Sequence, residues 1–185
     1  MTSNSRFKLA PLALVAAVAL ASTAHAATQT VSFNTLVASA TVAAPLAFGD
    51  NLVMNTLVTA STGALTQTIT FTVASGVNAF VGDAVWQTST ATGTGPRLTG
   101  VNVDIFNSAN ALVASDNFLG TLGGFAVSSF ASAITPGTYR LVATGTGVRD
   151  SVLDVSLSFV PEPGTYVLML AGLGMVGFMA RRRAA

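Results

Sequence analysis

The sequence predicts an all-β protein, an antiparallel β-sandwich, between an N-terminal signal helix and a C-terminal transmembrane helix. Within residues 27–159, short segments alternate polar and apolar residues, as strands with one buried face do. Turn residues separate these segments, which favours two packed antiparallel sheets. Hydrophobic residues make up 51% of the composition and concentrate at the two ends of the chain, outside this region.

Residues 1–26 have the three parts of a secretory signal peptide. A positive n-region is followed by an apolar core and then by Ala24-His25-Ala26, a small-x-small cleavage site. The apolar core is shorter than the roughly 20 residues that a spanning helix needs, which makes an uncleaved anchor the weaker alternative. We therefore expect signal peptidase to recognise Ala24 and Ala26 and to release a mature chain that begins at Ala27.

The strands of the central region are predicted from their alternation. Residues 107–110 are turn formers and predict a hairpin that joins 101–106 to 111–115. Residues 41–56 contain a proline and a glycine and are predicted to be loop with short strand pieces. The four segments that alternate most clearly are 68–73, 101–106, 139–144 and 153–159.

The charge distribution argues against a nucleic-acid partner. Residues 27–160 contain three arginines and six aspartates, a net charge of −3, whereas nucleic-acid binding needs a clustered basic face. Arg181, Arg182 and Arg183 instead follow the C-terminal apolar run. By the positive-inside rule they would stay in the cytoplasm, with the body of the protein outside the inner membrane.

Residues 27–160 contain no histidine, cysteine or lysine. A Ser-His-Asp triad, a cysteine nucleophile, a Schiff-base lysine and the usual zinc sites each need one of these residue types. The aspartates lie at turns and outward strand positions, without the convergence that two-carboxylate catalysis requires. We therefore predict a non-enzymatic protein, with no catalytic residues, no cofactor and no metal site.

Two binding functions stay open beside a structural role. Calcium accepts carboxylate, amide and carbonyl oxygens, and aromatic side chains can stack on the sugars of a polysaccharide. The oxygen donors to consider are Asp104, Asn107, Asp116, Asn117, Asp150 and Asp154, and the aromatic residues are Trp86, Phe118, Phe125 and Tyr139.

The segment 160–185 combines a Pro-Glu-Pro, a glycine-rich apolar run and three arginines. Pro161 and Pro163 lack backbone N–H groups and disfavour helix before them, so the chain around Glu162 should be extended and accessible. The low-charge run from Val160 onward is long enough to cross a hydrocarbon core of ~30 Å as a helix. The sequence thus predicts a transmembrane helix with a protease-accessible segment at its outer end.

This order of Val160-Pro161-Glu162-Pro163, apolar helix and arginine cluster resembles the PEP-CTERM sorting signal of Gram-negative bacteria. The resemblance implies a substrate of exosortase, a membrane-embedded transpeptidase that cuts near the Pro-Glu-Pro and removes the tail. It also implies export, a transient inner-membrane anchor, a final place at the cell surface or outside the cell, and association with exopolysaccharide and biofilm. A plain C-terminal anchor on a periplasmic protein is the alternative.

A broader resemblance concerns residues 98–159 and implies that the sandwich is jelly-roll-like. The segments 103–116 and 136–145 are similar to bacterial pre-peptidase C-terminal jelly rolls, and the same order occurs in the FxDxF-type subgroup of PEP-CTERM proteins. The motif that names this subgroup is poorly kept in residues 48–52, where Leu52 replaces the final Phe.

These observations together predict three parts: a signal peptide at 1–26, a β-sandwich domain at 27–159 and a sorting signal at 160–185.

Overall fold

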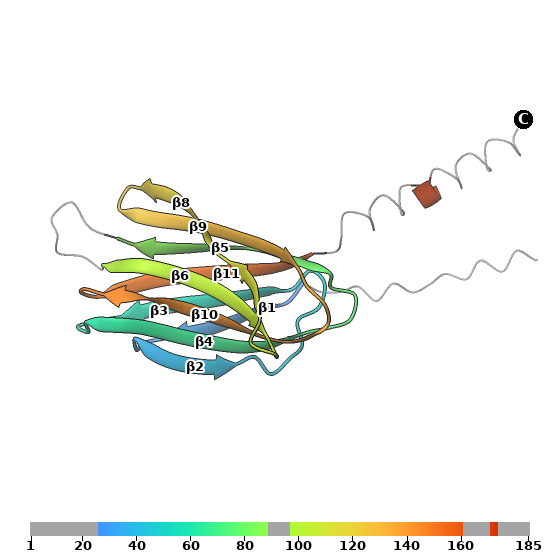
Figure 1. Cartoon of the computed structure of the whole chain (residues 1–185), viewed down its shortest axis with the longest axis horizontal. Coiled ribbons are helices and arrows are strands. Elements are labelled where there is room, and N and C mark those ends of the chain that lie inside the picture. The colour runs from blue at the N-terminus through green and yellow to red at the C-terminus, as the bar shows by residue number, and fades with distance from the viewer. Residues whose placement is uncertain (1–25, 89–96, 161–170, 174–185) are drawn as a thin grey trace, which may run out of the picture.

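The computed structural model describes residues 26–88, 97–160 and 171–173. The described residues form two facing β-sheets, with a single helical stretch at 171–173 (Figure 1). In chain order the strands are β1 (Thr28–Phe33), β2 (Val37–Thr41), β3 (Asn51–Val58), β4 (Gly63–Val73), β5 (Ala79–Gln87), β6 (Leu98–Asn107), β7 (Leu112–Ser115), β8 (Asn117–Leu122), β9 (Phe125–Ala133), β10 (Gly137–Gly147) and β11 (Ser151–Val160).

The six-stranded sheet has the order β1-β3-β11-β5-β9-β8, and the five-stranded sheet has the order β2-β4-β10-β6-β7. The prediction of an all-β sandwich is confirmed, and the finer jelly-roll assignment stays a prediction. The prediction that the sheets are antiparallel is wrong at one edge of each, because β1 pairs with β3, and β2 with β4, in parallel.

The connections between the sheets explain the two parallel pairs. The chain passes from β1 to β2 at the same end of the sandwich where it passes from β3 to β4. Both connections reverse the chain while they change sheets. β1 therefore runs in the same direction as β3, and β2 in the same direction as β4.

The prediction of loop with short strand pieces for residues 41–56 is also wrong, because a full strand, β3, begins at Asn51. Leu52, Met54 and Val58 of β3 point into the core. The outward positions include the apolar Leu57, and one inward position is a threonine, so the sequence shows no clear alternation here. The four strands predicted from alternation lie within β4, β6, β10 and β11, and the β6–β7 hairpin is confirmed.

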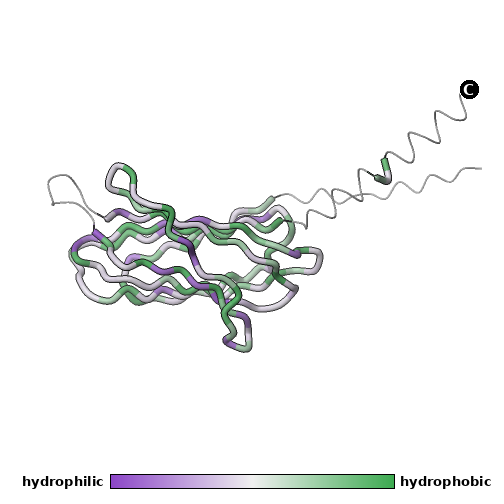
Figure 2. Tube along the Cα trace, turned by 45° about the horizontal axis from the view of Figure 1, so that its top comes forward, coloured by the Kyte–Doolittle hydropathy of each residue, from purple (hydrophilic) through white to green (hydrophobic). Residues whose placement is uncertain are grey.

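The core lies between the two sheets, and hydrophobic and polar residues alternate along the strands that enclose it (Figure 2). Phe71 of β4 is 1% exposed. Its ring centroid lies 6.0 Å from that of Tyr139 in the same sheet and 5.9 Å from that of Phe159 in the opposite sheet. Phe71 therefore connects the two layers directly.

The predicted signal helix and transmembrane helix lie almost entirely outside the described residues. Of the two segments, only Ala26, Val160 and residues 171–173 are described. Within the described ranges, no helix is long and apolar enough to cross a membrane.

We expect Phe71→Asp to lower the free energy of unfolding by at least about 3 kcal/mol, because it places a charge in an apolar layer without a partner. The measurement is urea unfolding of the mature protein, followed by tryptophan fluorescence of the core residue Trp86. Thr66→Asp, at an exposed position of the same strand, is the matched control and should change the stability little. Equal effects of the two substitutions would contradict the assignment of Phe71 to the core.

Candidate functional site

The sorting segment directly follows an interior strand. β11 lies between β3 and β5, and its pairing with β5 continues to the last residue of the strand, Val160, opposite Ala79. The next residue, Pro161, has no N–H with which to extend the ladder. The ordered sheet thus reaches the first residue of the predicted sorting signal.

Of the other predicted site residues, the structure describes one, Ala26. Ala26 is described and exposed, which leaves the predicted cleavage position at the surface. Ala24, Pro161, Glu162, Pro163 and the three arginines Arg181, Arg182 and Arg183 lie outside the described residues.

The loop between β2 and β3, residues 42–50, contacts the chain at both ends of the domain. Asp50, at the end of this loop, is 8% exposed. Its Oδ1 accepts a hydrogen bond of 2.7 Å from the N–H of Ala27. The N–H of Gly49 donates to the carbonyl of Phe159 (3.0 Å), and the N–H of Phe159 donates to the carbonyl of Asp50 (3.1 Å). Figure 1 shows β1 beginning and β11 ending at this same end of the sandwich.

Residues 159–183 match the PEP-CTERM protein-sorting motif. The match begins in the last two residues of β11 and confirms the sorting signal predicted from the sequence. The motif supports an exported protein that exosortase processes, with a C-terminal membrane anchor before processing. The assignment to the FxDxF-type subgroup is not supported by the match and stays a prediction.

The chain was also compared with curated proteins and with solved structures. No curated protein matches it. Among solved structures it is similar to the pre-peptidase C-terminal domain of collagenase from Bacillus anthracis, with 14% identity and a TM-score of 0.37, over 72% of this chain and 97% of that one. A TM-score this low does not establish a common fold.

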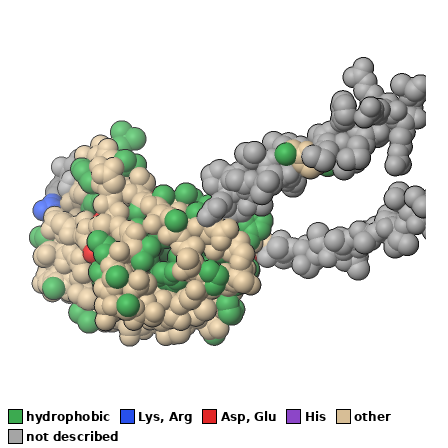
Figure 3. Space-filling model, turned by 45° about the vertical axis from the view of Figure 1, so that its right-hand side comes forward, with side chains coloured by type: hydrophobic (Ala, Val, Ile, Leu, Met, Phe, Trp, Pro, Cys, Tyr) green, Lys and Arg blue, Asp and Glu red, His purple; other side chains and the backbone are tan. Residues whose placement is uncertain are grey.

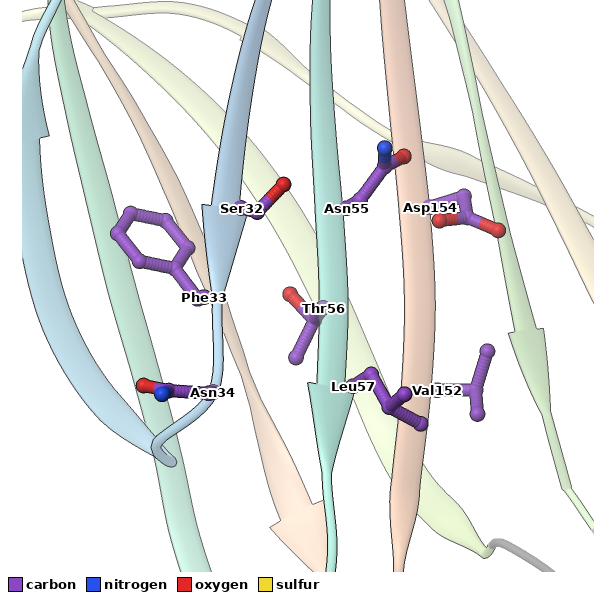
Figure 4. A pocket seen from close by; sticks show the side chains of 8 residues that line it. All are labelled: Ser32, Phe33, Asn34, Asn55, Thr56, Leu57, Val152 and Asp154. Atoms are coloured by element: carbon purple, nitrogen blue, oxygen red, sulfur yellow. The ribbon is translucent and has the colours of Figure 1, made fainter.

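A groove of about 590 Å³ lies on the six-stranded sheet, near the end of β1. Ser32, Asn55 and Asp154 are neighbours across β1, β3 and β11, and their side chains form a polar row along it (Figure 4). Partial burial raises the pKa of the Asp154 carboxyl above its ordinary value. The groove is lined by Ser32, Phe33, Asn34, Asn55, Thr56, Leu57, Val152 and Asp154.

The groove offers hydrogen-bonding groups and the carboxyl of Asp154. General acid–base hydrolysis of a glycosidic bond would need a second carboxyl close to the first. The direct cross-strand neighbours of Asp154 are Asn55 and Val85. The carboxyl of Asp83, two residues from Val85 on β5, accepts a hydrogen bond of 2.9 Å from the Ser156 hydroxyl and does not line the groove.

The aromatic residues considered for sugar stacking divide into two groups. Trp86 and Tyr139 are buried, with 5% and 6% exposure, and belong to the core. Phe118 and Phe125 are exposed, on β8 and β9. Because these strands lie at the edge of the sheet opposite to β1, the structure does not bring the exposed aromatics to the groove.

Several residues considered for calcium already accept hydrogen bonds: Asn107, Asp116 and Asp150 from backbone N–H groups, and Asp104 from the side-chain amide of Asn102. Asp116 Oδ1 accepts the N–H of Val103 (2.9 Å), and Asn107 Oδ1 accepts the N–H groups of Ala109 and Ala111 at 3.0 Å each. No three acidic, histidine or cysteine side chains gather as metal ligands in the part of the chain that the structure describes. On the face shown in Figure 3, charged side chains are sparse.

We expect Asp154→Asn to stabilise the protein slightly near neutral pH. Because burial raises the pKa of this carboxyl above 3.8, the folded state is favoured while the group is protonated. This contribution is complete below 3.8 and is lost as the pH rises through the raised pKa. The gain should stay below about 1 kcal/mol, because water screens an exposed carboxylate.

The measurement is urea unfolding of wild type and variant at about pH 3 and pH 7. Asp83→Asn removes an exposed carboxylate from the neighbouring strand β5 and is the control. A variant that is less stable than wild type at neutral pH would contradict the stated direction.

Proposed function

We propose that this is an exported, non-enzymatic protein of the cell surface or extracellular matrix, which exosortase sorts and which then joins exopolysaccharide or biofilm material of a Gram-negative bacterium. The observation that carries the proposal is the match of residues 159–183 to the sorting motif, which begins in the last two residues of the final strand of the sandwich. Signal peptidase, exosortase and, transiently, the inner membrane are the partners that this route requires.

The position of β11 supports this route. Because β11 ends at Val160, cleavage after this residue removes no strand from the six-stranded sheet, and β3 and β5 still hold β11 on both sides. The released domain would therefore keep its hydrogen-bond ladders and its core. A sorting signal that followed an edge strand would offer a weaker boundary, since only one ladder would hold that strand.

The composition supports a non-enzymatic role. Residues 27–160 lack histidine, cysteine and lysine, and the groove contains one carboxyl, Asp154. Reproducible turnover of a substrate by the purified protein, abolished by Asp154→Asn, would contradict this part of the proposal.

Binding of a polysaccharide at the groove is the second candidate function, and the polar row of Ser32, Asn55 and Asp154 favours it. Asn55→Ala should weaken the retention of the protein on immobilised exopolysaccharide about tenfold, because it removes both a donor and an acceptor from the centre of the row. Asn102→Ala, on the five-stranded sheet, is the control. If neither variant changes retention, the groove has no part in binding.

We expect Glu162→Gln to block sorting without blocking anchoring. The substitution removes the charge of the Pro-Glu-Pro and keeps its size, so full-length protein should accumulate in the inner membrane. The measurement is fractionation of a host that contains exosortase, with antibodies to the domain and mass spectrometry of the C-terminus. Thr165→Ser, in the same segment, should be sorted normally.

Replacement of Arg181, Arg182 and Arg183 by serine should have a different result. Without the positive-inside bias the helix should be held poorly in the membrane, and uncleaved protein should leave the inner-membrane fraction. If wild-type protein at the cell surface keeps its C-terminal tail, the segment is a plain anchor and the sorting proposal is wrong.

A further inference from the structure

We infer that Asp50 is a binding site for the α-ammonium group that signal peptidase creates at Ala27, and that removal of the signal peptide thereby strengthens the corner from which the sorting motif leaves. The inference uses the predicted cleavage after Ala26 and does not depend on the proposed sorting by exosortase.

The geometry of this site is present in the uncleaved chain. The backbone nitrogen of Ala27 lies 2.7 Å from Oδ1 of Asp50, and the N–H of Ala47 binds Oδ2 at 2.8 Å. The carbonyl of Ala27 accepts the N–H of Asn51 at 2.8 Å, which holds the residue in place from its other side. The nitrogen that becomes the new N-terminus is therefore already at the length of a charge-assisted hydrogen bond.

Cleavage changes the charge of this nitrogen and not its position. In the precursor it belongs to a neutral amide, whereas a free α-amino group has an ordinary pKa of about 7.7–8.0 and is mainly charged at neutral pH. Asp50 is 8% exposed and Ala27 lies at the surface, so water screens the pair only in part. A hydrogen bond between two charged groups is about twice as strong as one between neutral groups.

The loop that ends in Asp50 transmits this effect to the other end of the domain. It contains Gly49, in the left-handed region at φ 86°, and the buried Leu46. Gly49 and Asp50 bind the backbone of Phe159, one residue before Val160, through the two hydrogen bonds described above. An ion pair at Ala27 therefore stabilises the residues that fix the exit of β11.

The sequence allows a selective test. Lys8 is the single lysine of the chain and lies in the predicted signal peptide, so a chain that begins at Ala27 has one primary amine, its N-terminus. An amine-selective acetylating reagent therefore converts the α-ammonium to a neutral amide, and this chain has no other primary amine that it could modify.

The experiment uses mature protein purified after export of the full chain, with its N-terminus identified by mass spectrometry. Half of the sample is acetylated while unfolded and then refolded, and both halves are compared by pulse proteolysis in urea. We expect the free form to have a folding equilibrium constant about tenfold larger than the acetylated form. In Asp50→Asn the two forms should be equal, whereas Asp83→Asn, which also removes one carboxylate, should keep the difference.

Acetylation of the folded protein gives a second measurement. The reagent attacks the uncharged amine, and an ion pair favours the protonated form, so wild type should react about tenfold more slowly than Asp50→Asn at the same pH. If Asp50→Asn does not fold, the comparison of free and acetylated wild type still tests the inference.

Three results would overturn the inference: an N-terminus other than Ala27, equal stability of the free and acetylated wild type, or equal reaction rates of wild type and Asp50→Asn. A C-terminal tail that is retained after sorting would overturn the proposed function alone.

Discussion

The contacts of the Phe71 ring hold the two sheets in one structure. Phe71 stacks on Tyr139 in its own sheet and meets Phe159 of the opposite sheet edge to face. Phe159 is the penultimate residue of β11, so the interaction that joins the layers also fixes the strand that leads into the sorting motif. Tyr139 is held in turn by the hydrogen bond from its hydroxyl to the carbonyl of Thr135, at 2.8 Å. The end of β11, where the chain leaves the sandwich, is therefore packed into the core.

The order of the strands has a consequence for export. β11 is the last strand in sequence but lies inside its sheet, where β3 and β5 bind its two edges. The six-stranded sheet cannot form completely without residues 151–160. Folding of the domain is therefore completed only after this last strand has been exported. Long-range pairing of this kind makes folding depend on the whole domain, since the partners of β11 lie far from it in sequence. Cleavage beyond Val160 then acts on a domain that is already complete.

The sequence predicts which residues face the core better than it predicts the relative directions of the strands. Alternation identifies the buried face of β4 or β11 because the pattern has the period of a strand, but it contains no information about direction, so the parallel edges were missed. β3 was missed because Thr56 occupies a core position, where its hydroxyl donates to Oε1 of the buried Gln67 at 2.6 Å. The sorting motif is local and could be read from the sequence, whereas the contact of Asp50 with Ala27 joins residues 23 positions apart and needs the folded chain. The groove likewise combines three strands whose order no local pattern reveals.

The two chain boundaries and the groove lie at different ends of the six-stranded sheet, and this separation bears on what an anchored domain can bind. Asp154 precedes Val160 by six residues along β11, a distance of about 20 Å at the rise of an extended strand. Ala27 and Val160 both leave the sandwich at the end held by Asp50. If residues after Val160 anchor the protein in the membrane, the groove is displaced from that anchor by most of the length of the strand. The row of Ser32, Asn55 and Asp154 would then be equally accessible before and after cleavage, so sorting need not create or destroy the groove.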